Sequence, residues 1–271
     1  MIVMMTDFGL DDPYVGIMKG VIRRISPATE IIDLCHGIPP QQIRIGCLVL
    51  SRSMDYFPDG TIFLAVVDPG VGTDRKGIAI QCGPYYLIGP DNGLFSFVDE
   101  QRFPGYRMVE LDDPDWYRTR YPDSTFHGRD IFAPAAAWLD KGTKFHQLGS
   151  PHTDLIRLDF PAARYDDSGR LRVPLLMIDH FGNLIFALNR SEWMEQMGGK
   201  RVEIRYRGRR IGEPADCYAS GIGEEGELMA LFNSDQWLEL AVRNGSAASL
   251  VGIESIDGQE LAVVPIDKSK E

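Results

Sequence analysis

The stretch Ile2-Val3-Met4-Met5-Thr6-Asp7-Phe8-Gly9-Leu10-Asp11-Asp12-Pro13 lies at the start of the chain and indicates its fold. Its apolar residues predict a strand over Ile2–Met5, which a polar turn follows. Asp12-Pro13 predicts the start of a helix over Tyr14–Ile25, because an aspartate side chain can cap free N–H groups and proline is already set at the first helical φ. This order of elements places Thr6–Asp12 at the carboxyl end of a strand, where open α/β sheets bind ligands.

Alternation of strands and helices continues to about Leu158 and predicts βαβ units around a largely parallel sheet. We therefore expect residues 1–163 to form an α/β domain. The further strands expected in it are Glu30–Leu34, Thr61–Val67, Gly77–Cys82 and Tyr85–Gly89, and the further helices lie near Gln42–Tyr56 and over Ile131–Lys141.

The polar segment 164–170 lacks apolar periodicity, and we place the domain boundary there. Beyond it, short strand-like runs separated by glycine-containing turns predict that residues 171–271 form a small all-β barrel or sandwich. The expected strands are Leu171–Ile178, Leu184–Leu188, Arg201–Tyr206, Leu228–Phe232, Leu238–Val242 and Leu261–Val264.

The composition of the 271 residues, 44% hydrophobic and 25% charged, is that of a soluble, well-packed protein. No apolar stretch approaches the ~20 residues that span a bilayer, and the start lacks a signal peptide, so we expect a cytoplasmic protein without a membrane partner. The four cysteines have no zinc spacing and are expected to be reduced thiols. A formal charge of -11 argues against a nucleic-acid partner.

The first turn carries three carboxylates, Asp7, Asp11 and Asp12. A turn former at Asp11 and a helix cap at Asp12 would explain two of them structurally. Asp7 directly leaves the strand, where a carboxylate can accept two hydrogen bonds from a ribose diol. A divalent-metal site remains an alternative use of this acidic cluster.

A glycine-rich segment, Val67-Asp68-Pro69-Gly70-Val71-Gly72-Thr73, follows the next long strand. It matches neither phosphate-loop pattern, so phosphate binding has little support. We expect its glycines to allow a tight turn in which Asp68 faces Arg75, whose guanidinium would orient the carboxylate. Taken alone, this pair could also be an ordinary surface salt bridge.

An imidazole, His127, stands in Thr125-Phe126-His127-Gly128-Arg129-Asp130, just before an expected helix that Asp130 could cap. No HxH or HExxH spacing supports zinc. An acid, a cation and an imidazole on glycine-rich turns can position and polarise a water molecule, which a hydrolytic displacement needs. The histidines interpreted as structural or solvated are His36, His146, His152 and His180.

In the second half, Asp179-His180-Phe181-Gly182-Asn183 combines a carboxylate, an aromatic ring and a side-chain amide. It can be a plain turn, which asparagine and glycine favour. As a site it offers an acid for an ammonium group, an amide for a purine edge and a ring for stacking. Tyr218 and the segments 232–237 and 243–248 add another ring and exposed backbone groups.

These segments together resemble the S-adenosyl-L-methionine hydroxide adenosyltransferases (S-adenosylmethionine hydrolases), relatives of fluorinase and chlorinase. The resemblance extends along nearly the whole chain and consists of ordered matches. They are Thr6-Asp7-Phe8-Gly9, Val67-Asp68-Pro69-Gly70-Val71-Gly72-Thr73, Pro90-Asp91-Asn92-Gly93-Leu94, Thr125-Phe126-His127-Gly128-Arg129-Asp130, Asp179-His180-Phe181-Gly182-Asn183 and Phe232-Asn233-Ser234.

The resemblance implies an α/β amino-terminal domain and a carboxyl-terminal β-barrel, assembled as a homotrimer with sites between neighbouring subunits. It also implies S-adenosyl-L-methionine as substrate, without a cofactor or metal. Asp68, Arg75 and His127 would be catalytic, and Asp7 would hold the ribose hydroxyls. The other implied contacts are Asp11, Asp179 and Ser234 around the methionine portion, Phe126, Phe181, Asn183 and Tyr218 around the adenosine, and one of Arg243, Gly245 and Ala247 at the adenine.

In the related halogenases the halide pocket would use a tyrosine and, for fluoride, a serine, whereas this chain has Asp68 and Gly128 at the matching positions. A halide would be repelled by the Asp68 carboxylate, whereas water can donate a proton to it. The sequence therefore predicts hydrolysis of S-adenosyl-L-methionine to adenosine and L-methionine. A halide-dependent enzyme and a non-catalytic nucleoside-binding protein remain the alternatives.

Overall fold

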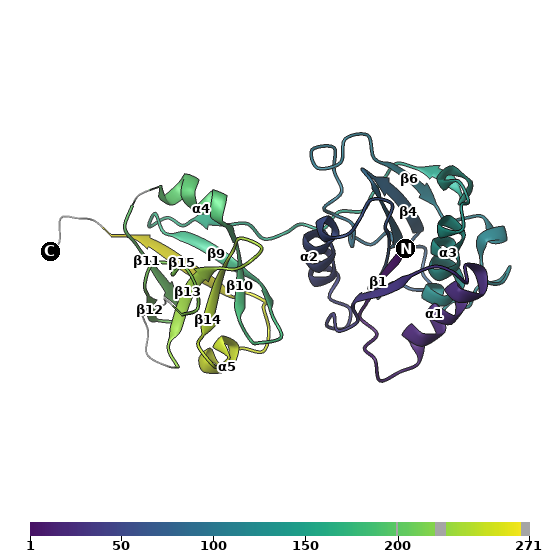
Figure 1. Ribbon diagram of the computed structural model, residues 1–271. Coiled ribbons are helices and arrows are strands. Elements are labelled where there is room, and N and C mark those ends of the chain that lie inside the picture. Colours follow the sequence, from purple (N-terminus) through teal and green to yellow (C-terminus); the bar gives the residue numbers. More distant parts are fainter. Residues whose placement is uncertain (199, 220–225, 267–271) are drawn as a thin grey trace. The chain divides into compact units, whose positions relative to one another are not determined.

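The structure is a computed structural model that describes residues 1–198, 200–219 and 226–266 (Figure 1). It divides into two compact units, Met1–Asp159 and Phe160–Glu271, called unit 1 and unit 2 below. Unit 1 combines a sheet with helices, and unit 2 is built mainly from antiparallel strands, so the predicted two-domain class is confirmed. None of the helices in the described ranges combines the length and the apolar character that a membrane span requires.

Unit 1 contains a mixed sheet with the strand order β2-β1-β3-β5-β4-β6-β7. The pairings that join β2, β1, β3 and β5 are parallel. The pairings that join β5, β4, β6 and β7 are antiparallel. The change of direction follows from the two-residue connection at Gly83, whose φ of 55° lets β4 return directly as β5. The strands are β1 (Ile2–Thr6), β2 (Ile31–Cys35), β3 (Ile62–Val66), β4 (Gly77–Cys82), β5 (Tyr85–Pro90), β6 (Arg107–Glu110) and β7 (Ser150–His152).

Helices cover both faces of this sheet, as Figure 1 shows. Alternate residues of β1 point to opposite faces. Ile2 and Met4 are buried in the cluster that includes α1 and α3, whereas Met5 lies on the side of α2, close to Gly46. The helices are α1 (Tyr14–Ile25), α2 (Ile43–Ser53) and α3 (Ala133–Asp140), with short turns η1 (Met54–Tyr56), η2 (Pro114–Trp116), η3 (Gly128–Phe132) and η4 (Phe145–Gln147).

The predicted helix over Tyr14–Ile25 is confirmed, but its predicted cap is wrong. Pro13, not Asp12, occupies the N-cap position, and no side chain caps the helix. The Pro13 carbonyl accepts the hydrogen bond of the Ile17 N–H at 2.9 Å, so the helical ladder begins one residue later than a cap at Asp12 requires.

Unit 2 contains an antiparallel sheet with the order β12-β11-β15-β9-β10-β14-β13, and β12 approaches β13, so the sheet curls into a barrel-like form. Its interior is filled by alternate apolar residues such as Val173, Phe186 and Leu240. The elements are β8 (Arg164–Tyr165), β9 (Leu171–Ile178), β10 (Leu184–Asn189), α4 (Arg190–Met197), β11 (Val202–Tyr206), β12 (Arg209–Ile211), β13 (Leu228–Phe232), β14 (Trp237–Val242), α5 (Ala247–Val251) and β15 (Glu260–Pro265).

The polar segment 164–170 forms a short hairpin in unit 2. Arg164 and Tyr165 form β8, which pairs with Arg172 and Leu171 of β9. The Asp166 carboxylate accepts backbone N–H bonds from Ser168 and Arg170 and closes the turn between the two strands. Polar capping of a tight turn therefore explains why the segment lacks apolar periodicity.

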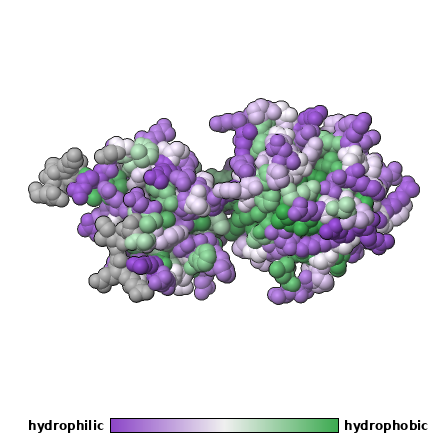
Figure 2. All heavy atoms as spheres, in the orientation of Figure 1, coloured by the Kyte–Doolittle hydropathy of each residue, from purple (hydrophilic) through white to green (hydrophobic). Residues whose placement is uncertain are grey.

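The surface carries hydrophobic residues among hydrophilic ones in both units, as Figure 2 shows. Around the start of α1, Leu10, Tyr14 and Ile17 are exposed.

Two cysteines, Cys47 and Cys82, are buried. Burial raises the pKa of the Cys47 thiol to about 11 and that of the Cys82 thiol to about 12. These two thiols are therefore protonated near neutral pH.

Candidate active site

The loop between β3 and β4 carries two of the predicted site residues, Asp68 and Arg75. Its glycines let it fold tightly. A Cβ on Gly70 would lie 3.3 Å from Arg75 Cγ, and Gly72 has a φ of +78° and would place a Cβ 2.4 Å from the Ser124 carbonyl oxygen. The loop therefore closes on itself and packs against the segment that leads to His127.

Asp68 and Arg75 form a buried, two-pronged ion pair. Arg75 Nε lies 2.9 Å from Asp68 Oδ1 and 3.0 Å from Oδ2, and Arg75 Nη2 also donates to Oδ2. Their side chains are only 5% (Asp68) and 8% (Arg75) exposed. The Phe132 ring lies beneath the guanidinium, 5.2 Å from Cζ. The pair thus differs from the surface salt bridge that the sequence left open.

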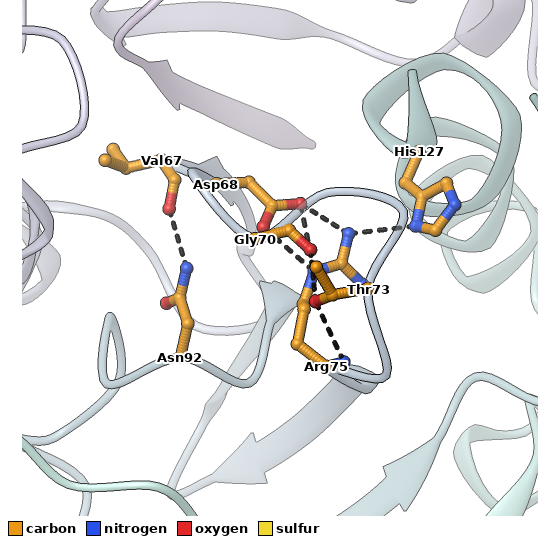
Figure 3. A network of polar contacts seen from close by, with 7 residues as sticks. All are labelled: Val67, Asp68, Gly70, Thr73, Arg75, Asn92 and His127. Atoms are coloured by element: carbon orange, nitrogen blue, oxygen red, sulfur yellow. Dashed lines mark hydrogen bonds and ion pairs between the residues drawn. The ribbon is translucent and has the colours of Figure 1, made fainter. Parts of the chain in front are cut away.

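His127 completes a continuous set of contacts, in which the Arg75 guanidinium lies between the carboxylate and the imidazole (Figure 3). Arg75 Nη2 lies 2.9 Å from His127 Nδ1. A guanidinium only donates, so Nδ1 must be the acceptor and the ring proton must sit on Nε2. Burial and the Arg75 charge lower the pKa of His127, in agreement with a neutral ring. His127 therefore offers a donor, Nε2–H, on its free side.

Asp130 holds the segment that presents His127. It lies inside the π-helix η3, whose N-cap is His127, so the predicted capping role of Asp130 is wrong. Its carboxylate is fully buried and accepts bonds from Arg129 Nε (2.7 Å), Arg129 Nη2 (2.8 Å), Asp123 N (2.9 Å) and Arg118 Nε. These donors hold the pKa of Asp130 well below its usual range, although burial alone would raise it. The result is a rigid support behind His127.

The turn after β1 is fixed from behind by a buried histidine. Thr6 Oγ1 lies 2.9 Å from His36 Nδ1 and accepts the Phe8 N–H at 3.2 Å. The Asp7 carboxylate accepts the Gln41 N–H at 2.8 Å through one oxygen, Oδ2. His36 is thus structural, as predicted, and it stabilises the turn that carries Asp7.

The other carboxylates of this turn are separate. Asp11 and Asp12 are both exposed. Among the described residues there is no group of three or more acidic, histidine or cysteine side chains that could hold a metal ion. The metal alternative for this turn therefore has no preformed site to support it.

An aromatic cluster brings the first turn and the His127 segment together. Phe8, Tyr14 and Phe126 contact one another edge to face, with ring centroids 5.9 Å (Phe8–Tyr14), 6.0 Å (Phe8–Phe126) and 5.3 Å (Tyr14–Phe126) apart. Unit 1 therefore places Phe126 beside the turn of Asp7, although the two segments lie far apart in sequence.

Unit 2 contains an open cavity of about 530 Å³ that includes three predicted adenosine contacts, Phe181, Asn183 and Tyr218. The Phe181 side chain is exposed and Asn183 is buried. The remaining lining residues are Ala219, Val242, Arg243, Asn244 and Gly245. Aromatic rings beside an amide form a surface suited to a purine base.

Two acids stabilise this cavity. Asp179 Oδ2 accepts the Asn183 Nδ2–H at 2.9 Å, which leaves the amide oxygen Oδ1 as the acceptor that Asn183 can offer. Tyr218 donates its hydroxyl to Glu239 at 2.7 Å, and burial together with this bond raises the pKa of Tyr218. Sequence reasoning missed Glu239, a buried acid inside the strand β14. Its signal was a charged residue in an otherwise apolar run.

Three predicted residues of unit 2, Asp179, Ser234 and Ala247, are not among the residues that line this cavity. Ser234 is exposed in the turn between β13 and β14, which the pairing of Asn189 with Trp237 places at the end of β10 away from the 179–183 loop. Ala247 is fully buried in the core of unit 2, whereas Arg243 and Gly245 reach the cavity.

Comparison with known families agrees with both units. Residues 2–149 match the model of the SAM hydroxide adenosyltransferase N-terminal domain, and residues 174–259 match that of the C-terminal domain. The chain belongs to the SAM hydroxide adenosyltransferase family. Asp68, Arg75 and His127 therefore lie in the part that matches the N-terminal domain of the SAM hydroxide adenosyltransferases.

Relatives within this family cover nearly the full chain. The (R)-S-adenosyl-L-methionine hydrolases of Salinispora tropica and Thermus thermophilus are 38% and 36% identical, over 92% of this chain and 92% and 94% of theirs. A fluorinase of Actinopolyspora mzabensis is 28% identical over 92% of this chain and 91% of its own. The crystal structure of an uncharacterized conserved protein from Thermotoga maritima has a TM-score of 0.86 and 31% identity, and covers 97% of this chain and 100% of that chain.

Proposed function

We propose that this SAM hydroxide adenosyltransferase family member hydrolyses S-adenosyl-L-methionine to adenosine and L-methionine. The observation that carries the proposal is the buried contact set of Asp68, Arg75 and His127. Family membership and the hydrolase names of the 38% and 36% identical relatives support the same substrate.

In the proposed reaction, water attacks the ribose C5′ in line with the departing sulfur. The C5′–S bond breaks as the C5′–O bond forms, and the sulfur leaves as the neutral thioether of methionine. The leaving group needs no proton, so the catalytic demand falls on the water, whose pKa in bulk is about 15.7. One proton must leave the water, and the products are adenosine, methionine and that proton.

Asp68 is the proposed acceptor of this proton. A carboxylate offers about four lone-pair positions, and Arg75 occupies part of them. His127 cannot accept this proton in the tautomer described above, because Nδ1 already accepts a hydrogen bond from Arg75 and Nε2 carries a hydrogen. Its Nε2–H is proposed to donate to the water oxygen and orient the second lone pair toward C5′. General-base help of this kind contributes about 10²–10⁴-fold, and positioning supplies more.

The halide-dependent alternative is less favourable at this site. A halide would meet the buried carboxylate of Asp68 in surroundings where charge repulsion is strong. The position of a fluoride-binding serine in the halogenases corresponds to Gly128, where a Cβ would lie only 3.2 Å from Met18 Sδ and 3.3 Å from Phe126 Cε2. Water fits both features better than an anion does.

The substrate contacts and the assembly are part of the proposal. Asp7 is proposed to hold the ribose diol, and the unit 2 cavity to hold the adenine. The chain is proposed to act in the cytoplasm as a homotrimer whose sites join unit 1 of one subunit to unit 2 of the next. The further contacts proposed are Asp11, Asp179 and Ser234 for methionine, Phe126, Phe181, Asn183 and Tyr218 for adenosine, and Arg243, Gly245 or Ala247 for the adenine edge.

Product analysis tests this function. Purified protein is incubated with S-adenosyl-L-methionine in ¹⁸O-labelled water, with and without chloride or fluoride, and the products are identified by mass spectrometry. Labelled adenosine at the same rate in all conditions supports hydrolysis. A 5′-halogenated nucleoside indicates a halogenase, and binding without any product indicates a nucleoside-binding protein.

Exchanging Asp7 for asparagine is expected to weaken adenosine binding about tenfold, because hydrogen bonds to a charged group contribute about 1.5–3 kcal/mol and the amide accepts them less strongly. Calorimetry measures the affinity. Asp12→Asn, an equal change at an exposed carboxylate of the same turn, is the control and is expected to bind normally. Equal affinities for Asp7→Asn and wild type would remove Asp7 from the ribose site.

The imidazole of His127 is expected to titrate below its ordinary pKa of 6.5, because burial and Arg75 lower the pKa. Protonation would remove the acceptor of the Arg75 bond and place two cations together. His127 should therefore stay neutral down to pH 6.5, and its protonation should reduce turnover only below that pH. In the unfolded chain His127 has its ordinary pKa of 6.5 and binds this proton at a higher pH than in the folded protein. Acidification below pH 6.5 therefore also lowers the free energy of unfolding. NMR titration measures the midpoint, with His127→Gln identifying the signal, and a midpoint above 6.5 would contradict the stated contacts.

A further inference from the structure

The loop that carries Asp68 and Arg75 is held at both ends by two consecutive residues. Asn92 Nδ2 donates to the carbonyl of Val67, the residue before Asp68, at 2.8 Å. The N–H of Asp91 donates to the carbonyl of Lys76, the residue after Arg75, also at 2.8 Å. Figure 3 shows the Asn92 amide directed at Val67. These residues belong to the segment Pro90-Asp91-Asn92-Gly93-Leu94, to which the proposed reaction assigns no role.

The Asn92 amide is itself fixed. Its oxygen accepts the Leu94 N–H at 3.2 Å, so both ends of the amide are hydrogen-bonded. Next to it, Gly93 has a φ of +98°, and a Cβ there would lie 2.3 Å from Leu158 Cγ. The backbone therefore packs closely against the segment that ends unit 1.

Asp91 is anchored to the same terminal segment. Its carboxylate, in a residue that is 2% exposed, accepts the Ile156 N–H at 2.9 Å and lies 3.3 Å from His152 Nε2. The residues that hold the loop are thus tied to a segment about sixty positions later in the chain. They cannot move independently of the packed body of unit 1.

We propose that Asn92 is a positioning residue of the water-activating site, which fixes Asp68 by holding the Val67 carbonyl. This inference rests on the proposed function. The Val67 carbonyl belongs to the peptide unit that leads into Asp68, so losing its hydrogen bond lets the carboxylate shift against the incoming water. A misplacement of about 1 Å can cost about 10²-fold in rate, without loss of substrate contacts.

The test uses Asn92→Asp in the full chain. Aspartate has nearly the same shape but in its ionised form cannot donate, and its oxygen would face the Val67 carbonyl. We expect kcat to fall between about tenfold and 10²-fold, with KM and the adenosine Kd within about twofold of wild type. In Asn92→Ser, which removes the same hydrogen bond without adding charge, kcat should also fall.

Thr61→Val provides the matched control. Thr61 is buried at the opposite end of β3, and its hydroxyl donates to the Pro58 carbonyl at 2.7 Å. The substitution therefore removes another side-chain bond to a backbone carbonyl near the same strand. We expect it to lower thermal stability with an unchanged kcat. If the Asn92 variants lose stability in the same way and keep wild-type kcat, Asn92 is merely structural and the inference is overturned.

A second measurement does not depend on turnover. Displacement of the loop weakens the Arg75–His127 contact, so the NMR titration of His127 in Asn92→Ser, which adds no charge, should move from its wild-type midpoint toward 6.5, and in Thr61→Val it should not move. An unchanged midpoint in Asn92→Ser overturns the inference even if the protein proves not to hydrolyse S-adenosyl-L-methionine. If the wild type forms no product but the His127 midpoint still shifts in Asn92→Ser, the proposed function is wrong, whereas the role of Asn92 in fixing the contacts of Asp68, Arg75 and His127 is retained.

Discussion

Replacing Asp68 by asparagine is expected to lower kcat for adenosine formation about 10³-fold, within the range that general-base catalysis contributes. The amide keeps the size of the side chain and can still accept a hydrogen bond, but it cannot take a proton from water. Binding of adenosine should change little, because the proposed contacts of the nucleoside lie elsewhere. Initial rates measured by chromatography of released adenosine, together with calorimetry, separate the two effects.

Asp74→Asn is the control for this substitution. Asp74 lies in the same loop but is exposed, so the equal chemical change should leave kcat unaltered. Wild-type kcat in Asp68→Asn would show that Asp68 does not accept the proton. A large rise in adenosine Kd would instead reassign Asp68 to substrate binding.

Replacing Arg75 by methionine is expected to lower the free energy of unfolding by about 3 kcal/mol, because removing one partner of a buried ion pair leaves the other charge uncompensated. The remaining carboxylate of Asp68 is only 5% exposed, so water can compensate it poorly. The same change removes the donor to His127 Nδ1 and should abolish most turnover. Chemical denaturation measures the loss of stability.

Two further variants check the origin of this effect. The double variant Asp68→Asn/Arg75→Met should be destabilised by less than the sum of the single changes, because the uncompensated charge is gone. Lys76→Met removes a neighbouring, 47% exposed cation and should cost less than about 1 kcal/mol. Additive losses in the double variant would mean that Asp68 and Arg75 do not act as a pair.

Much of the fold follows from local sequence patterns. The strands and helices with clear apolar periodicity, such as the helix over Tyr14–Ile25, were predicted correctly. The strands β6 and β7 were missed, because β6 has only Met108 and Val109 as buried apolar residues and β7 contains Pro151. Proline fits an edge strand but interrupts the usual pattern. Such strands form because the existing sheet provides a partner.

In the site, too, contacts within one short loop could be predicted, whereas contacts between distant segments could not. Asp68 and Arg75 were expected to meet because a short glycine-rich loop joins them, and the structure brings them together. The buried support at Asp130 was misread as a helix cap, since only the folded chain brings Arg118 to it. Asn92 and Glu239 act on residues from other segments, so no spacing in the sequence could reveal their partners.

All contacts that bind Asp68, Arg75 and His127 to one another lie within unit 1, whereas the open cavity beside Phe181, Asn183 and Tyr218 lies in unit 2. This separation has a practical meaning for enzyme engineering. Under the proposed function, libraries restricted to residues 68–75 and 127–128 vary the surroundings of the incoming nucleophile, while the proposed adenosine contacts Phe126, Phe181, Asn183 and Tyr218 are left unchanged. Directed evolution toward other nucleophiles can therefore begin from a small set of positions in one folding unit.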